Sequence, residues 1–76
     1  MKITHVAVRK GGKVYSLPRP NRHKDVRKHY GIDGGDSGFL INGDFHNRTE
    51  AGKVALKSGQ IKSMATPPYL HSEDLW

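Results

Sequence analysis

The dipeptide Asn42-Gly43 is the sequence feature that most restricts what this chain can fold into. It follows the apolar run Phe39-Leu40-Ile41 and precedes Asp44-Phe45, so it predicts a two-residue turn between antiparallel strands. Asparagine and glycine both tolerate the positive φ angles that such a turn requires. The middle of the chain is therefore expected to form a β-hairpin.

A second hairpin is predicted in the first third of the chain. Residues 3–8 alternate weakly between apolar and polar side chains, and residues 13–17 form a second strand-like segment. Gly11-Gly12 joins the two segments and supplies the turn. Pro18 ends the sheet, because its ring nitrogen has no hydrogen to donate to a neighbouring strand.

Each hairpin is followed by the start and stop signals of a short helix. Asn21 is the expected N-cap of the first helix, which runs to about Tyr30. Asn47 is the expected N-cap of the second helix, with Glu50 three residues later in a capping-box arrangement and Gly59 beyond the last turn.

Two units of hairpin followed by helix predict an α+β fold. We expect one small single domain over residues 1–76, in which two β-hairpins form an antiparallel sheet and two short helices pack on it. The glycine-rich segment 33–38, which lies between the two units, is expected to be a mobile loop.

The size of the chain limits its stability. A domain of this length buries only about 60% of the surface of its extended chain, and the sequence has no cysteine for a disulfide. Small domains often gain stability by association, so we expect a homo-oligomer. Residues 62–76 form a C-terminal arm, whose Leu75-Trp76 end is expected to pack on a groove of its own chain or of a neighbouring subunit.

The charge of the chain favours acidic partners. Thirteen Lys and Arg residues against seven Asp and Glu residues give a formal net charge of +6 at pH 7, which suits nucleotides, nucleic acid or an acidic protein surface. No apolar run is long enough for a membrane span or a signal peptide, and the absence of cysteine fits a reducing cytoplasm. The five histidines lack the local pairing of zinc ligands, so no metal or cofactor is predicted.

An arginine occupies the first turn of each predicted helix, on the side that carries the apolar residues. These two residues are Arg22 and Arg48. A guanidinium suits two-point binding of phosphate or carboxylate, and the free N–H groups of a helix start attract anions. An anion site is therefore predicted, the alternative being that both side chains follow the edge of the core into solvent.

Six residues are predicted to bind the ligand: Asn21, Arg22, His23, Tyr30, Arg48 and Tyr69. The arginines would hold phosphates, Asn21 and His23 would form hydrogen bonds to ribose or base, and one of the tyrosines would stack on the base. His23 is also a candidate general acid or base, because imidazole titrates near neutrality. No positioned carboxylate or second base accompanies it, so a binding protein is favoured over an enzyme.

The segment Gly35-Asp36-Ser37-Gly38 looks like the nucleophile segment of chymotrypsin-type serine proteases. That chemistry needs a histidine and an aspartate positioned by two β-barrels, together with an oxyanion hole. A chain of 76 residues cannot build this scaffold, so the protease interpretation is rejected.

Several segments resemble a widespread family of small phage-encoded proteins. They are Gly12 to Val26 (GKVYSLPRPNRHKDV), Gly38-Phe39-Leu40, Asn47 to Ala51 (NRTEA), Ser58 to Ile61 (SGQI) and Leu70 to Trp76 (LHSEDLW). The resemblance covers most of the chain and implies a viral accessory or counter-defence factor made in the bacterial cytoplasm. Position 24 is commonly a second histidine in the family pattern, so Lys24 weakens the case for a two-histidine catalytic site.

The leading hypothesis is a phage counter-defence protein that binds a phosphate-bearing small molecule, such as a nucleotide immune signal of the host, without consuming it. One alternative is a basic protein that binds nucleic acid or a host protein. Another is a metal-independent phosphodiesterase that uses His23. All three need the same cationic residues, so the sequence leaves them open.

Overall fold

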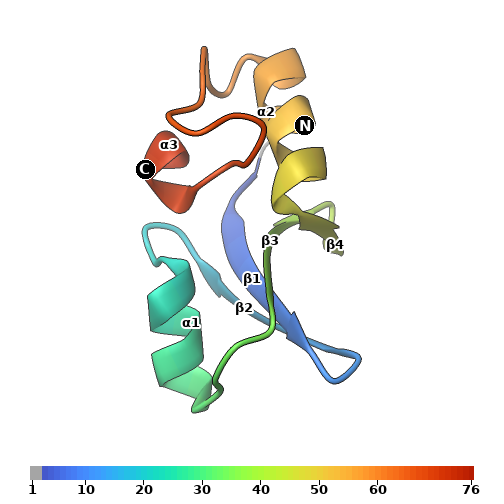
Figure 1. The fold of residues 1–76 in the computed structure, drawn as a ribbon, viewed down its shortest axis with the longest axis vertical. Coiled ribbons are helices and arrows are strands. Elements are labelled where there is room, and N and C mark those ends of the chain that lie inside the picture. Colours follow the sequence, from blue (N-terminus) through green and yellow to red (C-terminus); the bar gives the residue numbers. More distant parts are fainter. Residues whose placement is uncertain (1–2) are drawn as a thin grey trace.

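Both predicted hairpins are present in the computed structural model, which describes residues 3–76, and they join in one antiparallel sheet (Figure 1). The strands are β1 (His5–Lys10), β2 (Lys13–Pro18), β3 (Asp36–Ile41) and β4 (Asp44–Asn47), in the order β2-β1-β3-β4. The helices are α1 (His23–Tyr30), α2 (Arg48–Ser58) and the short α3 (Ser72–Leu75). In the described part of the chain no helix is long and apolar enough to cross a membrane. The predicted α+β fold class is confirmed.

Turn chemistry explains why the hairpins form where the sequence predicts them. Gly11 and Gly12 have φ angles of 59° and 75°, and Asn42 and Gly43 have φ angles of 52° and 83°. Two consecutive positive φ angles give a turn whose twist matches that of antiparallel strands. The first strand ends at Lys10, two residues beyond the predicted end.

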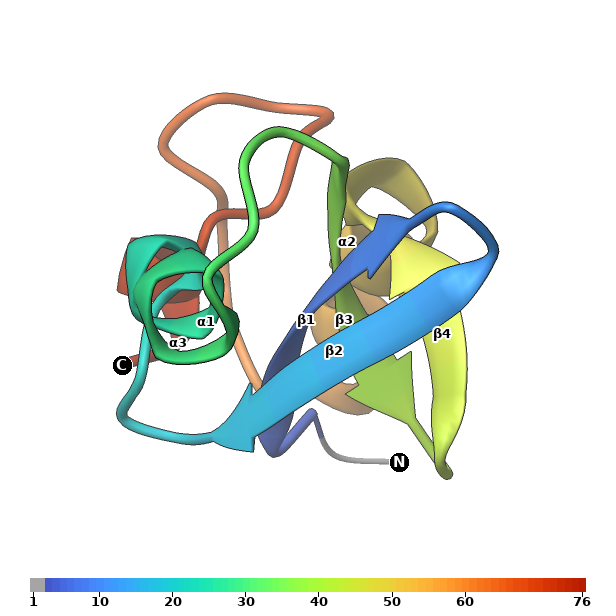
Figure 2. The same cartoon turned by 90° about the horizontal axis from the view of Figure 1, so that it is seen from below.

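One face of the sheet carries the core. The register pairs Val6 of β1 with Phe39 of β3, and Val8 points to the same side because side chains alternate along a strand. Helix α1 packs on β1 and β2, whereas α2 packs on β3 and β4 (Figure 2). The buried members of the core are Ile3, Val6, Val8, Val26, Phe39, Ile41, Ala51, Ala55, Ile61 and Leu70. In this arrangement the N-terminal ends of α1 and α2 face each other (Figure 1).

The N-cap prediction for the first helix is wrong by one residue. Arg22, not Asn21, is the N-cap of α1. The Asn21 side chain and backbone N–H instead donate to the Pro18 carbonyl oxygen at 2.8 and 3.1 Å. The Asp25 carboxylate accepts from the Arg22 N–H at 2.8 Å and supplies the cap. The Asn21 side-chain amide thus stabilises the tight turn after β2 and does not cap the helix, although the local sequence predicts it as the cap.

The loop predicted over residues 33–38 is also shorter than expected. Strand β3 begins at Asp36, because this residue pairs with Arg9 of β1. Gly38 is buried, and a Cβ atom added to it would lie 2.3 Å from the His46 carbonyl oxygen and 2.5 Å from Cζ of Phe45. Gly38 therefore permits close packing inside the sheet.

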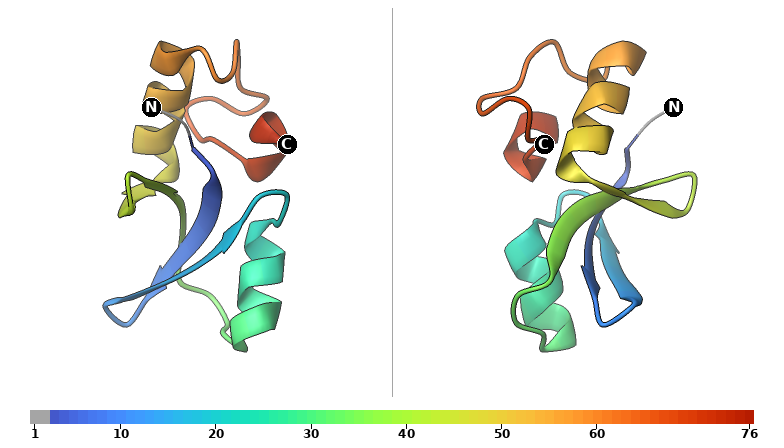
Figure 3. Two further views of the ribbon diagram at one scale, coloured as in Figure 1. Left: turned by 180° about the vertical axis from the view of Figure 1, so that it is seen from behind. Right: turned by 45° about the vertical axis from the view of Figure 1, so that its right-hand side comes forward.

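The C-terminal arm folds back on its own chain (Figure 3). Just before the arm begins, the Gln60 side chain accepts from the Ile3 N–H at 2.7 Å and donates to the Ile3 carbonyl oxygen at 2.8 Å. Further along the arm, Leu70 joins the core, and Trp76 Nε1 donates to the Asn21 carbonyl oxygen at 2.9 Å. A contact between the arm and a second subunit stays a prediction.

Candidate functional site

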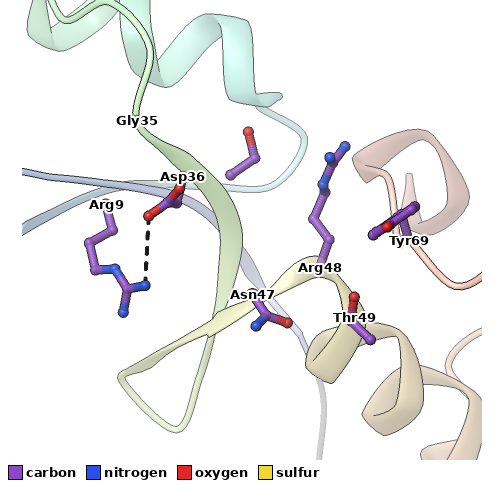
Figure 4. A pocket seen from close by; sticks show the side chains of 8 residues that line it. Arg9, Gly35, Asp36, Asn47, Arg48, Thr49 and Tyr69 are labelled. Carbon is purple, nitrogen blue, oxygen red and sulfur yellow. Dashed lines mark ion pairs between the residues drawn. The ribbon is translucent and has the colours of Figure 1, made fainter.

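Two cavities lie beside the first turn of α2, and the second of them also borders the first turn of α1. The first, of about 480 Å³, is lined by Arg9, Gly35, Asp36, Ser37, Asn47, Arg48, Thr49 and Tyr69 (Figure 4). The second, of about 440 Å³, is lined by Arg22, His23, Lys24, Ser37, Arg48, His71, Ser72 and Glu73. Ser37 and Arg48 line both cavities, so the two adjoin at these residues, and we refer to them together as the groove. We call its two parts the Tyr69 end and the His71 end.

Arg48 is the cation in the middle of this groove. The Asn47 side chain accepts from the Glu50 N–H at 2.9 Å, and this cap makes Arg48 the first residue of α2. The Arg48 guanidinium lies 5.5 Å from the centre of the Tyr69 ring (Figure 4). Within residues 3–76 no carboxylate forms an ion pair with it. The half-buried charge of Arg48 is thus left without a counter-charge.

Arg22 lines the same groove but is already engaged by the C-terminal arm. Its Nη2 donates to the Trp76 backbone oxygen at 2.7 Å, and its Nη1 donates to Ser72 Oγ at 3.4 Å. The same Nη1 lies 3.5 Å from a carboxylate oxygen of Glu73. A hydrogen bond from its own backbone N–H lowers the pKa of Glu73, with smaller effects from Ser72 and Arg22. Glu73 therefore stays ionised beside Arg22.

His23 is a neutral imidazole in the wall of the groove. Its Nε2 lies 2.7 Å from the Gly38 carbonyl oxygen, and Nε2 must carry the hydrogen because a carbonyl only accepts. Burial lowers the pKa of His23 below its ordinary value; the Gly38 hydrogen bond opposes this effect, while the charges of Arg27 and Arg48 add to it. The second nitrogen of the neutral ring, Nδ1, is a hydrogen-bond acceptor.

Arg27 fixes the position of residues 34–37, a segment that includes the start of β3 and lines the groove. Its Nε donates to the Gly34 carbonyl oxygen at 2.9 Å, and its Nη2 donates to Ser37 Oγ at 3.0 Å. The Ser37 oxygen accepts from Arg27, and its own O–H can still donate. Gly35, with a φ of 83°, lets this segment approach β1, since a Cβ atom there would lie 2.9 Å from the Arg9 carbonyl oxygen.

The charges at the Tyr69 end largely balance. Arg9 pairs with Asp36 at 3.7 Å, and the Arg9 guanidinium lies 4.6 Å from the centre of the Phe45 ring. Asn47 and Thr49 add neutral polar groups from the start of α2. This end of the groove is therefore polar but carries little net charge apart from Arg48.

The structure brings four of the six predicted ligand-binding residues to the groove: Arg22, His23, Arg48 and Tyr69. Asn21 lines a separate cavity of about 360 Å³ beside α1. Tyr30 packs its ring 5.2 Å from that of Tyr15 and donates to the Ser16 carbonyl oxygen at 3.1 Å. Ligand binding by any of the six stays a prediction.

The sequence did not predict the other polar residues that line the groove: Arg9, Lys24, Asp36, Ser37, Asn47, Thr49, His71, Ser72 and Glu73. The basic run around Lys24 was a usable signal. Arg9 and Asp36 gave none, because strand register brings them together across the fold. In the part of the chain that the structure describes, no group of three or more His, Cys, Asp or Glu side chains could hold a metal ion.

Comparison with protein families gives a match over most of the chain. A sequence model of the family described as Phage T4 y16D protein matches residues 2–76. This match agrees with the resemblance to small phage proteins. No curated protein and no solved structure matches the chain.

Proposed function

The chain belongs to the Phage T4 y16D family, and we propose that it binds a phosphate-bearing small molecule in the groove between α1 and α2. In this proposal the protein is a phage accessory or counter-defence factor. It sequesters a nucleotide immune signal in the cytoplasm of the bacterial host and does not consume it.

The unpaired charge of Arg48 is the observation that carries the proposal. Burying part of a cation without a counter-charge is unfavourable, so it suggests an anion that is supplied from outside the chain. A guanidinium offers two parallel N–H donors to a phosphate, an arrangement that a lysine cannot reproduce. The contact with the Tyr69 ring orients these donors without using a carboxylate.

The surroundings of Arg48 support the same ligand class. The first turns of α1 and α2 both line the groove, through His23 and Lys24 on one side and Arg48 and Thr49 on the other. Backbone N–H groups at the start of a helix have no acceptor within the helix and favour negative charge. The hydroxyl of Ser37 adds a neutral donor between the two helices.

Two observations favour binding over catalysis. His23 uses one ring nitrogen to hold the Gly38 carbonyl. The acidic residues of the groove are Asp36, which pairs with Arg9, and Glu73, which lies beside Arg22. In a catalytic triad a carboxylate contacts the imidazole and stabilises its protonated form, and neither of these two carboxylates contacts His23.

The distribution of charge also favours a compact ligand over nucleic acid. A phosphate track would need a row of unpaired cations along the surface. Here Arg9 and Arg22 are each balanced by a carboxylate, so the unpaired charge of the groove is concentrated at Arg48 and Lys24.

Thermal unfolding and calorimetry with inorganic pyrophosphate and ADP test the proposal. Both probes are expected to bind and to raise the melting temperature, because a ligand that binds only the folded state stabilises it. Arg48→Gln is expected to weaken binding of both probes at least tenfold, the loss for a charge-assisted hydrogen-bonding group. Lys53→Gln, which removes an exposed charge from the same helix outside the groove, is the matched control.

Three results would count against the proposal. One is that neither probe binds the wild-type protein. Another is that Arg48→Gln and Lys53→Gln weaken binding equally, which indicates diffuse attraction. A third is a steep fall in affinity with salt, because release of many counterions indicates a polyanion.

We also propose that the chain self-associates. The small size of the core supports this, since domains of this length often gain stability from a partner. Sedimentation at tens of micromolar tests it, and a single monomeric species would contradict it.

A further inference from the structure

We infer that the groove has a direction, and that it takes a nucleoside phosphate with its base at Tyr69 and its phosphates between Arg48 and Lys24. The inference rests on the proposed function and narrows the ligand class. It derives from the different chemistry of the two ends, which share Arg48 and Ser37.

The His71 end is the cationic end. Lys24 is exposed there and forms no ion pair within residues 3–76. Arg22 also lines this end, but Glu73 lies 3.5 Å from it and offsets its charge. Together with the shared Arg48 these side chains leave excess positive charge at this end, which suits a terminal phosphate.

The Tyr69 end suits an uncharged planar group. Arg9 and Asp36 offset each other's charge, and 48% of the Tyr69 surface remains exposed. An exposed tyrosine ring in a groove offers a stacking surface for a nucleobase, and stacking tolerates any base because every base has a π face.

Asp36 and Asn47 lie at the same end and suit a ribose. The Asp36 carboxylate is 72% exposed and makes only a long contact of 3.7 Å with Arg9, so it can accept hydrogen bonds from sugar hydroxyls. The side-chain N–H₂ group of Asn47 can donate to the sugar or the base, because the helix cap uses only the Oδ1 atom of this side chain, which accepts from the Glu50 N–H.

The middle of the groove suits the phosphate that follows the ribose. The Arg48 guanidinium and the Ser37 hydroxyl line both cavities. The Ser37 oxygen accepts from Arg27 at 3.0 Å, which leaves its hydrogen to donate to a phosphate oxygen. A nucleoside phosphate bound in this direction has its base and ribose beside groups with little net charge and its terminal phosphate beside cationic groups.

Comparing ADP with inorganic pyrophosphate tests the direction, because the two probes differ by the nucleoside alone. Wild-type protein is expected to bind ADP about tenfold more tightly than pyrophosphate, a ratio typical of stacking one base. Tyr69→Ala is expected to abolish this ratio by weakening ADP more than pyrophosphate, and the pyrophosphate binding that remains also shows that the variant is folded. Tyr30→Ala, which removes an exposed tyrosine from α1 outside the groove, is the matched control and keeps the ratio.

The outcomes separate this inference from the proposed function. If wild type binds ADP and pyrophosphate equally, the nucleoside makes no contact and the inference is wrong, while phosphate binding stands. If Tyr69→Ala weakens both probes equally, or Tyr30→Ala removes the ratio instead, the direction is wrong. If wild type binds neither probe, the proposed function itself fails.

Discussion

The Arg22 guanidinium donates a 2.7 Å hydrogen bond to the backbone oxygen of Trp76, and the Trp76 indole donates a 2.9 Å hydrogen bond to the carbonyl oxygen of Asn21. The start of α1 and the C-terminal arm therefore hold each other at two neighbouring points. Arg48 begins α2 without such a contact to a carboxylate or to the end of the arm within residues 3–76. This difference decides which arginine is available to a ligand.

Trp76→Ala is expected to lower the free energy of unfolding by about 2 kcal/mol, because it removes a partly buried ring and the indole hydrogen bond. Urea denaturation at neutral pH measures the change. Tyr69→Ala, which removes a more exposed aromatic side chain from the same arm, is the control and is expected to change stability by roughly 0.5 kcal/mol or less. Equal losses in the two variants would mean that Trp76 does not anchor the arm.

Features that depend on neighbouring residues could be predicted from the sequence. The Asn42-Gly43 turn forms because both residues accept positive φ angles. The Asn47 cap forms because Glu50 lies three residues away and completes the reciprocal hydrogen bonds. Asn21 has the same local chemistry, but a turn back to Pro18 competes for its amide. The competing contact is the reason that the prediction failed there.

Features that depend on distant residues could not be predicted in this way. Arg22 is the N-cap of α1 and Arg48 is the first residue of α2, and local sequence does not show that the C-terminal arm engages Arg22 alone of the two. Helical periodicity places Arg27 on the side of its helix away from Val26, but its long side chain reaches Ser37 across the loop. Helical periodicity gives the direction of a Cβ atom, not the end point of a long side chain.

Gly38→Ala is expected to destabilise the fold by about 3 kcal/mol, since the new methyl group would lie 2.3 Å from the His46 backbone oxygen, which cannot move without breaking the sheet. Gly52→Ala is the matched comparison. Its methyl group would meet the flexible Met64 side chain at 2.9 Å, and alanine favours the helix by roughly 0.5–1 kcal/mol. Urea denaturation is expected to show a near-neutral effect for Gly52→Ala. The reverse order of the two effects would contradict the packing around Gly38.

Arg27→Ala is expected to loosen residues 33–37, because it removes the hydrogen bonds to the Gly34 carbonyl and the Ser37 hydroxyl. Hydrogen exchange of the amides in this segment should become faster, and pyrophosphate affinity should fall several-fold. Lys28→Ala, the next residue of the same helix, lies outside the groove and is the control. Unchanged exchange in Arg27→Ala would show that these contacts do not order the segment.

Stability is expected to fall as the pH is lowered through the titration range of His23. The folded protein has a depressed pKa for this residue, whereas the unfolded chain titrates near the ordinary value of 6.5. The unfolded state thus binds more protons below that pH, and the stability that is present above pH 6.5 is lost on acidification. Urea denaturation between about pH 7.5 and about pH 5 measures the loss. His23→Gln, which can still donate to the Gly38 carbonyl, is expected to flatten the profile, and a profile identical to that of wild type would assign the effect to other groups.

The last prediction separates sequestration from turnover. ADP that has been incubated with the protein is expected to be recovered intact after denaturation, because His23 has no carboxylate partner in the described groove and one of its nitrogens holds the Gly38 carbonyl. In a binding protein His23→Ala should leave ADP intact and weaken its affinity by at most about 1 kcal/mol, roughly fivefold, because an acceptor nitrogen forms no hydrogen bond with a phosphate oxygen. In an enzyme the same change should reduce cleavage by a factor of about 10² or more and leave most of the binding. Chromatography of the recovered nucleotide distinguishes the two, and cleavage by wild type that is absent in His23→Ala would identify a hydrolase.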